Sequence, residues 1–128
     1  MIQYDDIEGK DYRVTHRISR KTSIKPPQPI KDQFASLDTE GVIVLLPGFC
    51  YDGATGAVDT DSIMTASAFH DAATDWYNRG LLTKAERKIA DQMFKSINKE
   101  GEMPSLRVKW TYQAVRKFFE FKEKIKFW

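Results

Sequence analysis

The chain has 128 residues, of which 41% are hydrophobic and 30% charged, and its formal net charge is +2. This size suffices for one hydrophobic core but not for two domains, and the near-neutral charge gives no general reason to expect nucleic acid as a partner. A single cysteine excludes an internal disulfide, and no apolar run approaches the roughly 20 residues of a membrane span. We therefore expect one domain that folds in a reducing cytoplasm.

The first part of the chain predicts β structure. Over about 12–24, β-branched and charged residues alternate loosely, which is typical of a half-buried strand with His16 at the surface. The proline-rich stretch from Lys25 to Pro29 interrupts regular structure and is expected to be a connector. Residues 41–46 read Gly-Val-Ile-Val-Leu-Leu, a short apolar run that predicts a buried strand. We expect a small antiparallel sheet from these strands.

A glycine-rich loop is predicted over 47–60, where the sequence includes Pro-Gly-Phe-Cys-Tyr-Asp-Gly-Ala-Thr-Gly. Asp52 and Gly53 form a common turn dipeptide, and the Asp52 carboxylate is suited to binding loop amides. Cys50 is expected to be a small buried hydrophobic residue, because nothing near it in sequence would lower the pKa of its thiol.

Three helices are predicted in the remainder of the chain, at about 62–79, 83–100 and 105–126. The first has Thr60 or Asp61 as its N-cap and Gly80 just beyond its C-terminus. The second begins at a capping box formed by Thr83 and Glu86. The fold class is therefore α+β in a single domain, with a β part, a loop and a helical part at 1–46, 47–60 and 61–128.

His70 and Asp71 are adjacent on the first helix. Neighbours on a helix point about 100° apart, so these two side chains are not expected to be partners. His70 falls at the edge of an apolar stripe, where it is either a core histidine bonded to a loop carbonyl or to Asp52, or a catalytic base. Asp71 lies on the polar side with Asp75, where the carboxylates either are solvated or accept hydrogen bonds from the preceding loop.

On the second helix, the helical wheel places Asp91 on the polar side. Arg87 and Lys95 lie four residues before and after it. A surface ion pair is therefore one interpretation of Asp91, and it would contribute less than about 1 kcal/mol.

The third helix has two apolar ridges. One contains Leu106, Trp110, Ala114, Phe118, Phe121, Ile125 and Trp128, and the other contains Val108, Tyr112, Val115 and Phe119. A helix that is apolar on two sides is either buried between two layers or shared with a partner chain. We take the second ridge, together with Trp128, as the candidate partner surface for another protein or for self-association.

The end of the chain is basic as well as aromatic. Its basic residues are Arg116, Lys117, Lys122, Lys124 and Lys126. Such a segment is suited to a membrane surface or lipid, or to a protein partner, and a core helix with solvated lysines is the alternative. Nucleic acid is not expected, since only part of the charge clusters on one face.

Four motifs carry a family resemblance. They are Pro-Gly-Phe at 47–49, Asp-Gly-Ala-Thr at 52–55, Ala-Phe-His-Asp at 68–71 and the helical stretch 87–94. In this order they resemble a family of tailed-phage and prophage proteins, the domain of unknown function 1353 family. The resemblance covers roughly 42–94. It implies a phage protein that works in the cytoplasm of the infected bacterial host or in the virion, without a settled activity.

The same region is more distantly similar to small bacterial secreted phospholipases. This similarity implies that His70 is the general base and that Asp91 orients it. It also implies Ca²⁺ bound by Asp71, Asp52 and Gly53, because calcium takes several oxygen ligands. The loop around this site would be completed by Tyr51, Ala54, Thr55 and Gly56.

Three classes of function follow from the sequence. The first is a cation-dependent hydrolase that uses His70. The second is a non-catalytic virion or tail-assembly component, and the third is a host-directed protein that binds a component of bacterial defence.

Overall fold

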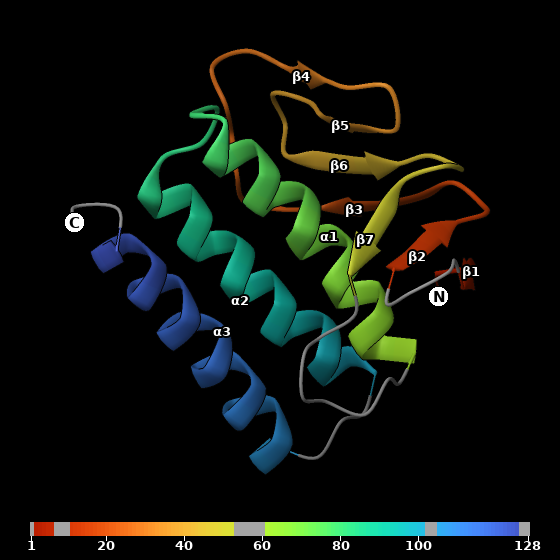
Figure 1. The fold of residues 1–128 in the computed structure, drawn as a ribbon. Coiled ribbons are helices and arrows are strands. Elements are labelled where there is room, and N and C mark those ends of the chain that lie inside the picture. Colours follow the sequence, from red (N-terminus) through yellow and green to blue (C-terminus); the bar gives the residue numbers. More distant parts are fainter. Residues whose placement is uncertain (1, 7–10, 53–60, 102–104, 126–128) are drawn as a thin grey trace.

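The computed structural model describes residues 2–6, 11–52, 61–101 and 105–125 of the chain, and these ranges form an α+β fold. In Figure 1 the strands come first and the helices follow. The strands are β1 (Tyr4–Asp6), β2 (Asp11–Val14), β3 (Ile18–Lys21), β4 (Ile30–Lys31), β5 (Ala35–Leu37), β6 (Val42–Leu45) and β7 (Cys50–Asp52). The helices are α1 (Asp61–Asn78), α2 (Lys84–Glu100) and α3 (Ser105–Ile125).

The described strands form two antiparallel sheets, in the orders β1-β2-β7 and β3-β6-β5-β4. The single strand predicted over 12–24 is wrong, because β2 and β3 separate within it and enter different sheets. The strand predicted over 41–46 is confirmed as β6. Part of the predicted loop over 47–60 is strand β7, which pairs with β2.

One glycine fixes the turn into β6. Gly41 has φ +96°, and a Cβ atom there would lie 2.4 Å from the Thr22 carbonyl oxygen and 2.5 Å from that of Ile24. Only glycine fits both the backbone angle and this close approach. The register that follows pairs Leu37 with Ile43 and places the two side chains in the core.

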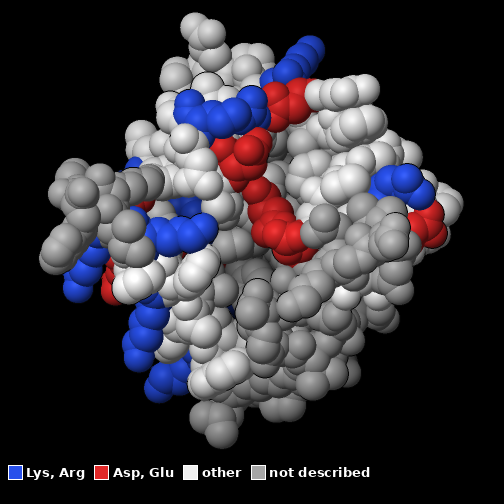
Figure 2. Space-filling model, viewed as in Figure 1, with Lys and Arg blue, Asp and Glu red and all other residues white. Residues whose placement is uncertain are grey.

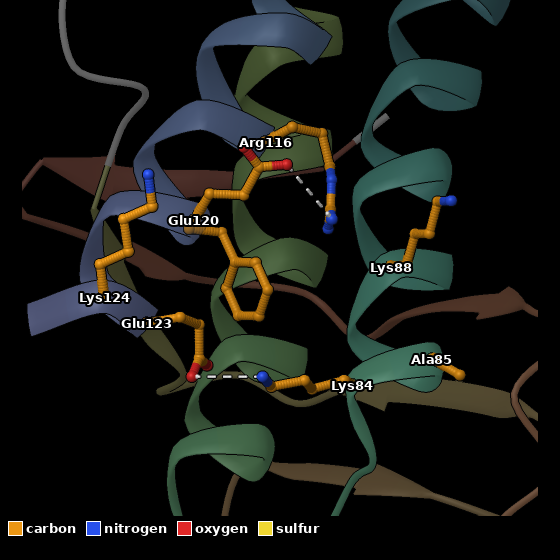
Figure 3. Close-up of a pocket in the computed structure, with 8 residues that line it drawn as sticks. Lys84, Ala85, Lys88, Arg116, Glu120, Glu123 and Lys124 are labelled. Carbon is orange, nitrogen blue, oxygen red and sulfur yellow. Dashed lines mark ion pairs between the residues drawn. The ribbon is translucent and has the colours of Figure 1, made fainter. Parts of the chain in front are cut away.

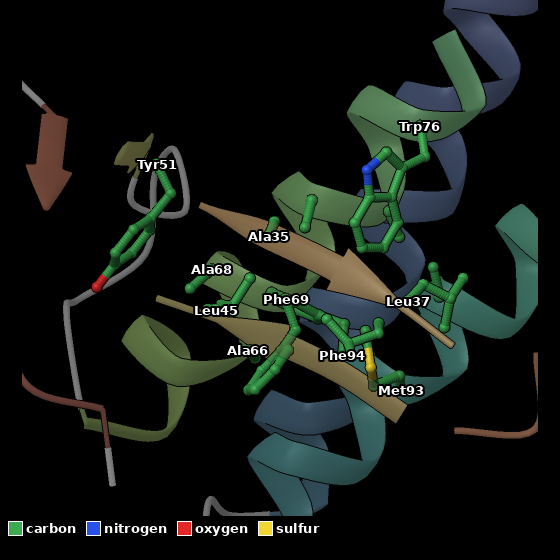
Figure 4. Packing of buried hydrophobic residues seen from close by; sticks show 14 of the residues in the cluster. Ala35, Leu37, Leu45, Tyr51, Ala66, Ala68, Phe69, Trp76, Met93 and Phe94 are labelled. Atoms are coloured by element: carbon green, nitrogen blue, oxygen red, sulfur yellow. The ribbon is translucent and has the colours of Figure 1, made fainter. Parts of the chain in front are cut away.

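The core lies between the larger sheet and the helices. In Figure 4, Phe69 and Trp76 of α1 point toward strand residues such as Leu37 and Leu45, and all four are buried. The Trp76 indole N–H donates to the Asp32 carboxylate at 2.8 Å, which satisfies the one polar atom of this ring. The helices lie side by side, with α2 between α1 and α3 (Figure 1).

The predicted helices are confirmed to within a residue or two at their ends. The capping box is also confirmed: the Glu86 amide donates to Thr83 Oγ1 at 3.2 Å, and the Thr83 amide donates to Glu86 Oε1 at 2.8 Å. Gly80 follows α1 with φ +79°. Among the described helices, none is long and apolar enough to span a membrane.

The orientation of the two ridges of α3 is the reverse of the expected one, because the ridge predicted to be a partner surface faces the core and the other ridge faces solvent. Val108 is buried and Tyr112, Val115 and Phe119 are half-buried, so the predicted partner surface faces into the protein. Trp128, its remaining member, lies outside the described residues. The exposed ridge is the other one, in which the large described residues are Trp110, Phe118 and Phe121. The choice between faces depends on Arg116, which binds a buried carboxylate of α2.

Candidate functional site

His70 of α1 and Asp91 of α2 meet at the interface of the two helices. His70 Nε2 lies 2.6 Å from Asp91 Oδ1. The His70 side chain keeps 14% of its surface exposed, whereas Asp91 is completely buried. The adjacent residue Asp71 does not take part in this contact, so the prediction that His70 and Asp71 have different partners is confirmed.

Asp91 is therefore not the surface residue that the helical wheel indicated. Its carboxylate receives hydrogen bonds from Arg87, one turn earlier on α2, and from Arg116 of α3, whose Nη1 lies 2.7 Å from Asp91 Oδ2. Arg87 is itself buried. Lys95 lies instead 5.2 Å from the Tyr112 ring centroid. A carboxylate can occupy this interior because two guanidinium groups and an imidazole surround it.

Phe119 supports the two arginines from the α3 side. The guanidinium carbons of Arg87 and Arg116 lie 4.9 Å and 5.2 Å from the centroid of its ring. Tyr77 of α1 packs edge-on against the same ring at 5.4 Å. Cation–π contacts of this kind strengthen when the cation is shielded from water, so Phe119 helps to hold the arginines against Asp91.

The charge states of the pair follow from its surroundings. Burial lowers the pKa of His70 more than the hydrogen bond to Asp91 raises it, and the charge of Arg87 lowers it further. Burial would raise the pKa of Asp91, but the hydrogen bond from His70 and the charge of Arg87 hold it below its usual value. The pair at neutral pH is therefore a neutral imidazole and a carboxylate. Because a carboxylate only accepts, Nε2 carries the proton and Nδ1 keeps its lone pair.

Asp71 ties the glycine-rich segment to α1. Its Oδ2 accepts a hydrogen bond from the Asp52 amide at 2.7 Å, at the end of β7. Of the two interpretations of Asp71, the contact to the preceding segment is thus confirmed. Tyr51 is buried beside this contact, while the predicted loop residues Gly53, Ala54, Thr55 and Gly56 lie outside the described residues.

Cys50 is exposed, so the prediction that it is buried is wrong. Strand β7 alternates, and it is Tyr51 that points inward while Cys50 and Asp52 point outward. Within the ranges that the structure describes, no three His, Cys, Asp or Glu side chains lie close enough to hold a metal ion. Of the predicted cation ligands, Asp71 contacts the backbone amide of Asp52 rather than its carboxylate, and Gly53 lies outside the described residues.

A shallow groove of about 500 Å³ runs between α2 and α3 (Figure 3). Its lining residues are Lys84, Ala85, Lys88, Arg116, Phe119, Glu120, Glu123 and Lys124. Two ion pairs cross or border it, Lys84 with Glu123 at 3.9 Å and Arg116 with Glu120 at 4.0 Å. His70 does not line this groove, so the groove reaches the buried charges only through Arg116.

Sequence reasoning missed Arg116 as part of the site. It is twenty-five residues from Asp91 and was grouped with the solvated basic residues near the end of the chain. The spacing of Arg116 could have indicated its inward position, because it directly follows Val115 and lies about one turn before Phe119. Both of these residues face the core. Comparison with known protein families, curated proteins and solved structures gives no match to this chain.

Proposed function

We propose that this protein is a small phage-encoded hydrolase in which His70 is the general base and Asp91 orients it. The observation that carries the proposal is the 2.6 Å contact between His70 Nε2 and Asp91 Oδ1. An imidazole held by a carboxylate is a common way to take a proton near neutral pH.

The proposed step begins at Nδ1 of His70. A water molecule gives its proton to the Nδ1 lone pair while its oxygen attacks the carbonyl carbon of an ester, and the imidazolium that forms is stabilised by Asp91. The tetrahedral intermediate then breaks its bond to the alcohol oxygen, which takes the proton from Nδ1 and leaves as the alcohol, so that the acid is released and His70 is neutral again. Arg87 and Arg116 keep Asp91 ionised for this role, since both donate to its carboxylate. The lowered pKa of His70 keeps the base unprotonated at neutral pH.

A cation site beside the base is the second part of the proposal. The Asp71 carboxylate meets the Asp52 backbone amide one residue along α1 from His70. The Asp71 carboxylate and the backbone carbonyl of Asp52 are oxygen ligands of the type that Ca²⁺ prefers. Gly53 and the following loop carbonyls would complete the ligands. In this position a cation would polarise the carbonyl oxygen of the substrate.

Ester hydrolysis by matched variants tests the base. We expect release of fatty acid or nitrophenol from phospholipid vesicles or p-nitrophenyl esters in the presence of CaCl₂, and its loss by at least about 10²-fold in His70→Gln and Asp91→Asn. His16→Gln is the matched control, because His16 is the other histidine and lies between β2 and β3, away from the pair. Full activity in His70→Gln, or no ester hydrolysis by the wild-type protein with and without calcium, contradicts the proposal.

Thermal stability tests the cation separately. A cation that binds only the folded protein must raise its melting temperature. We expect CaCl₂ to raise the melting temperature of the wild-type protein and of Asp75→Asn, but not of Asp71→Asn. Asp75 is the matched control because it lies one turn further along α1 and pairs with Arg79. If CaCl₂ raised the melting temperature of Asp71→Asn as much as that of the wild-type protein, the ion would bind at another site.

The second candidate function is a non-catalytic virion, assembly or host-binding protein. The observation that favours it is that Arg87 and Arg116 already donate to both oxygens of the buried Asp91 carboxylate. The cluster around Asp91 then has a structural role of its own, without catalysis by His70. In that case His70→Gln lowers the melting temperature and there is no hydrolysis to lose. The activity assay and the melting curve of this one variant therefore separate the two functions.

A further inference from the structure

The outer face of α3 carries a ridge of exposed aromatic side chains. Trp110, Phe118 and Phe121 are 58%, 62% and 60% exposed. With Ala114, they fall within a sector of about 80° on the helix and extend over about 17 Å of its length. Large aromatic side chains that are exposed next to one another indicate a contact surface, whereas single exposed apolar residues are common on any protein.

Lysines border this aromatic ridge on both sides. Lys109, Lys117 and Lys124 lie on one side and Lys122 on the other, and all four are exposed. The Lys122 ammonium lies 4.8 Å from the centroid of the Phe118 ring. Within the described part of α3, the one exposed carboxylate is Glu120. The ridge is therefore apolar at its centre and basic at its edges.

Charge selects the partner of this surface. A second copy of the ridge would bring the lysines of the two chains together, and like charges at such an interface are unfavourable. A lipid bilayer with anionic headgroups instead accepts the aromatic rings at the boundary of headgroups and acyl chains, while the lysine stems extend to the phosphates. We propose that α3 docks this protein on an anionic membrane surface through Trp110, Phe118 and Phe121.

The distribution of charge over the molecule would orient this docking. In Figure 2, Lys and Arg side chains follow the α3 edge at the lower left, whereas carboxylates gather over α1. An anionic surface attracts the first region and repels the second, so the helix would lie flat on the membrane with α1 turned away. The proposal does not depend on the hydrolase function, because neither His70 nor Asp91 belongs to the ridge.

Sedimentation of the full chain with lipid vesicles tests the proposal. We use vesicles of phosphatidylcholine alone and of phosphatidylcholine mixed equally with phosphatidylglycerol. We expect at least about tenfold stronger binding to the anionic vesicles, weakened by salt. The triple variant W110S/F118S/F121S should lose at least about tenfold of the binding. The variant K109Q/K117Q/K124Q should lose about fivefold for each lysine removed.

Two control variants alter similar residues elsewhere. Leu81→Ser removes an exposed apolar side chain at the turn between α1 and α2, and K25Q/K31Q removes two exposed lysines near β4. Both should bind as the wild-type protein does, and circular dichroism should be unchanged in every variant. Tryptophan emission should shift to the blue on binding, and Trp110→Phe should reduce the shift.

Three results would overturn the proposal. They are equal binding to both kinds of vesicle or to neither, binding that survives the triple variant, and a dimer in sedimentation velocity that the triple variant dissociates in the absence of vesicle binding. The last would show that the ridge joins two copies of the chain.

Discussion

The inner and outer faces of α3 differ in a way that hydrophobicity alone does not explain. The inner face places Arg116 against Asp91, a buried carboxylate, while the outer face leaves three large aromatic side chains in contact with solvent. A rotation of the helix would bury the aromatic ridge and expose the arginine. The structure has the opposite arrangement.

The magnitudes of the two effects account for this arrangement. Burying the three aromatic side chains of the ridge would contribute about 5–9 kcal/mol, at about 1.5–3 kcal/mol for each. Leaving a buried carboxylate without one of its partners costs about 3–5 kcal/mol. The inner face also keeps its own apolar contacts through Val115 and Phe119, so a rotation would lose these while it gained the ridge. Because these apolar gains and losses largely offset each other, the requirement of Asp91 for Arg116 decides which face of α3 turns inward.

Removing the Asp91 carboxylate should have the largest effect. Asp91→Ala leaves Arg87 buried without a counter-charge, and we expect it to lower the free energy of unfolding by about 3–5 kcal/mol, measured by urea denaturation. Asp75→Ala, on the exposed side of α1, should lower it by about 1 kcal/mol or less. Equal effects of the two substitutions would mean that the buried network does not organise the helices.

A smaller effect on the free energy of unfolding is expected from substituting either of two adjacent phenylalanines, Phe119 on the inner face of α3 and Phe118 on the outer face. Phe119→Ala removes a half-buried ring that contacts Arg87, Arg116 and Tyr77, and we expect a loss of about 2 kcal/mol, less than the 3–5 kcal/mol of a fully buried phenylalanine. Phe118→Ala changes an exposed ring and should alter the free energy of unfolding by about 0.5 kcal/mol or less. Chemical denaturation of both variants measures this difference. If Phe118→Ala were the more destabilising, the outer ridge would be covered in solution.

Much of the fold could be predicted from the sequence because its signals are local. The capping box at Thr83 and Glu86 gave the start of α2, and the apolar run before Pro47 gave β6. The shortest strands could not be found, since β4 has two residues, which are too few for an alternation to be recognised. The division between β2 and β3 also depends on pairing with distant strands, β7 and β6.

The candidate site could be predicted only in part, for the same reason. The resemblance to phospholipases implied that Asp91 contacts His70, whereas the wheel of α2 placed Asp91 outside because it counts a carboxylate as polar wherever its partners lie. The partner that changes this result, Arg116, belongs to another helix. A carboxylate that is surrounded by hydrogen-bond donors from three helices can be recognised only when the helices are packed together.

Of the predicted changes in the free energy of unfolding, the change with pH should be the smallest, and it is specific to the titration of His70. The pKa of His70 in the folded protein lies below the value of about 6.5 expected in the unfolded chain. Between these two values the unfolded chain binds a proton that the folded protein does not, so acid favours unfolding. The free energy of unfolding should therefore fall as the pH drops from about 7 toward the folded pKa, by at most about 1.4 kcal/mol per pH unit from this group.

His70→Gln should flatten this part of the pH profile, because glutamine can donate to Asp91 without titrating. His16→Gln, at the surface position between β2 and β3, is the control and should keep the wild-type profile. Urea denaturation of the three proteins across this pH range measures the difference. If the wild-type protein became more stable as the pH fell, the imidazolium would be the preferred partner of Asp91. The burial that keeps His70 neutral would then be weaker than the attraction of the carboxylate, and His70 could not serve as a base at neutral pH.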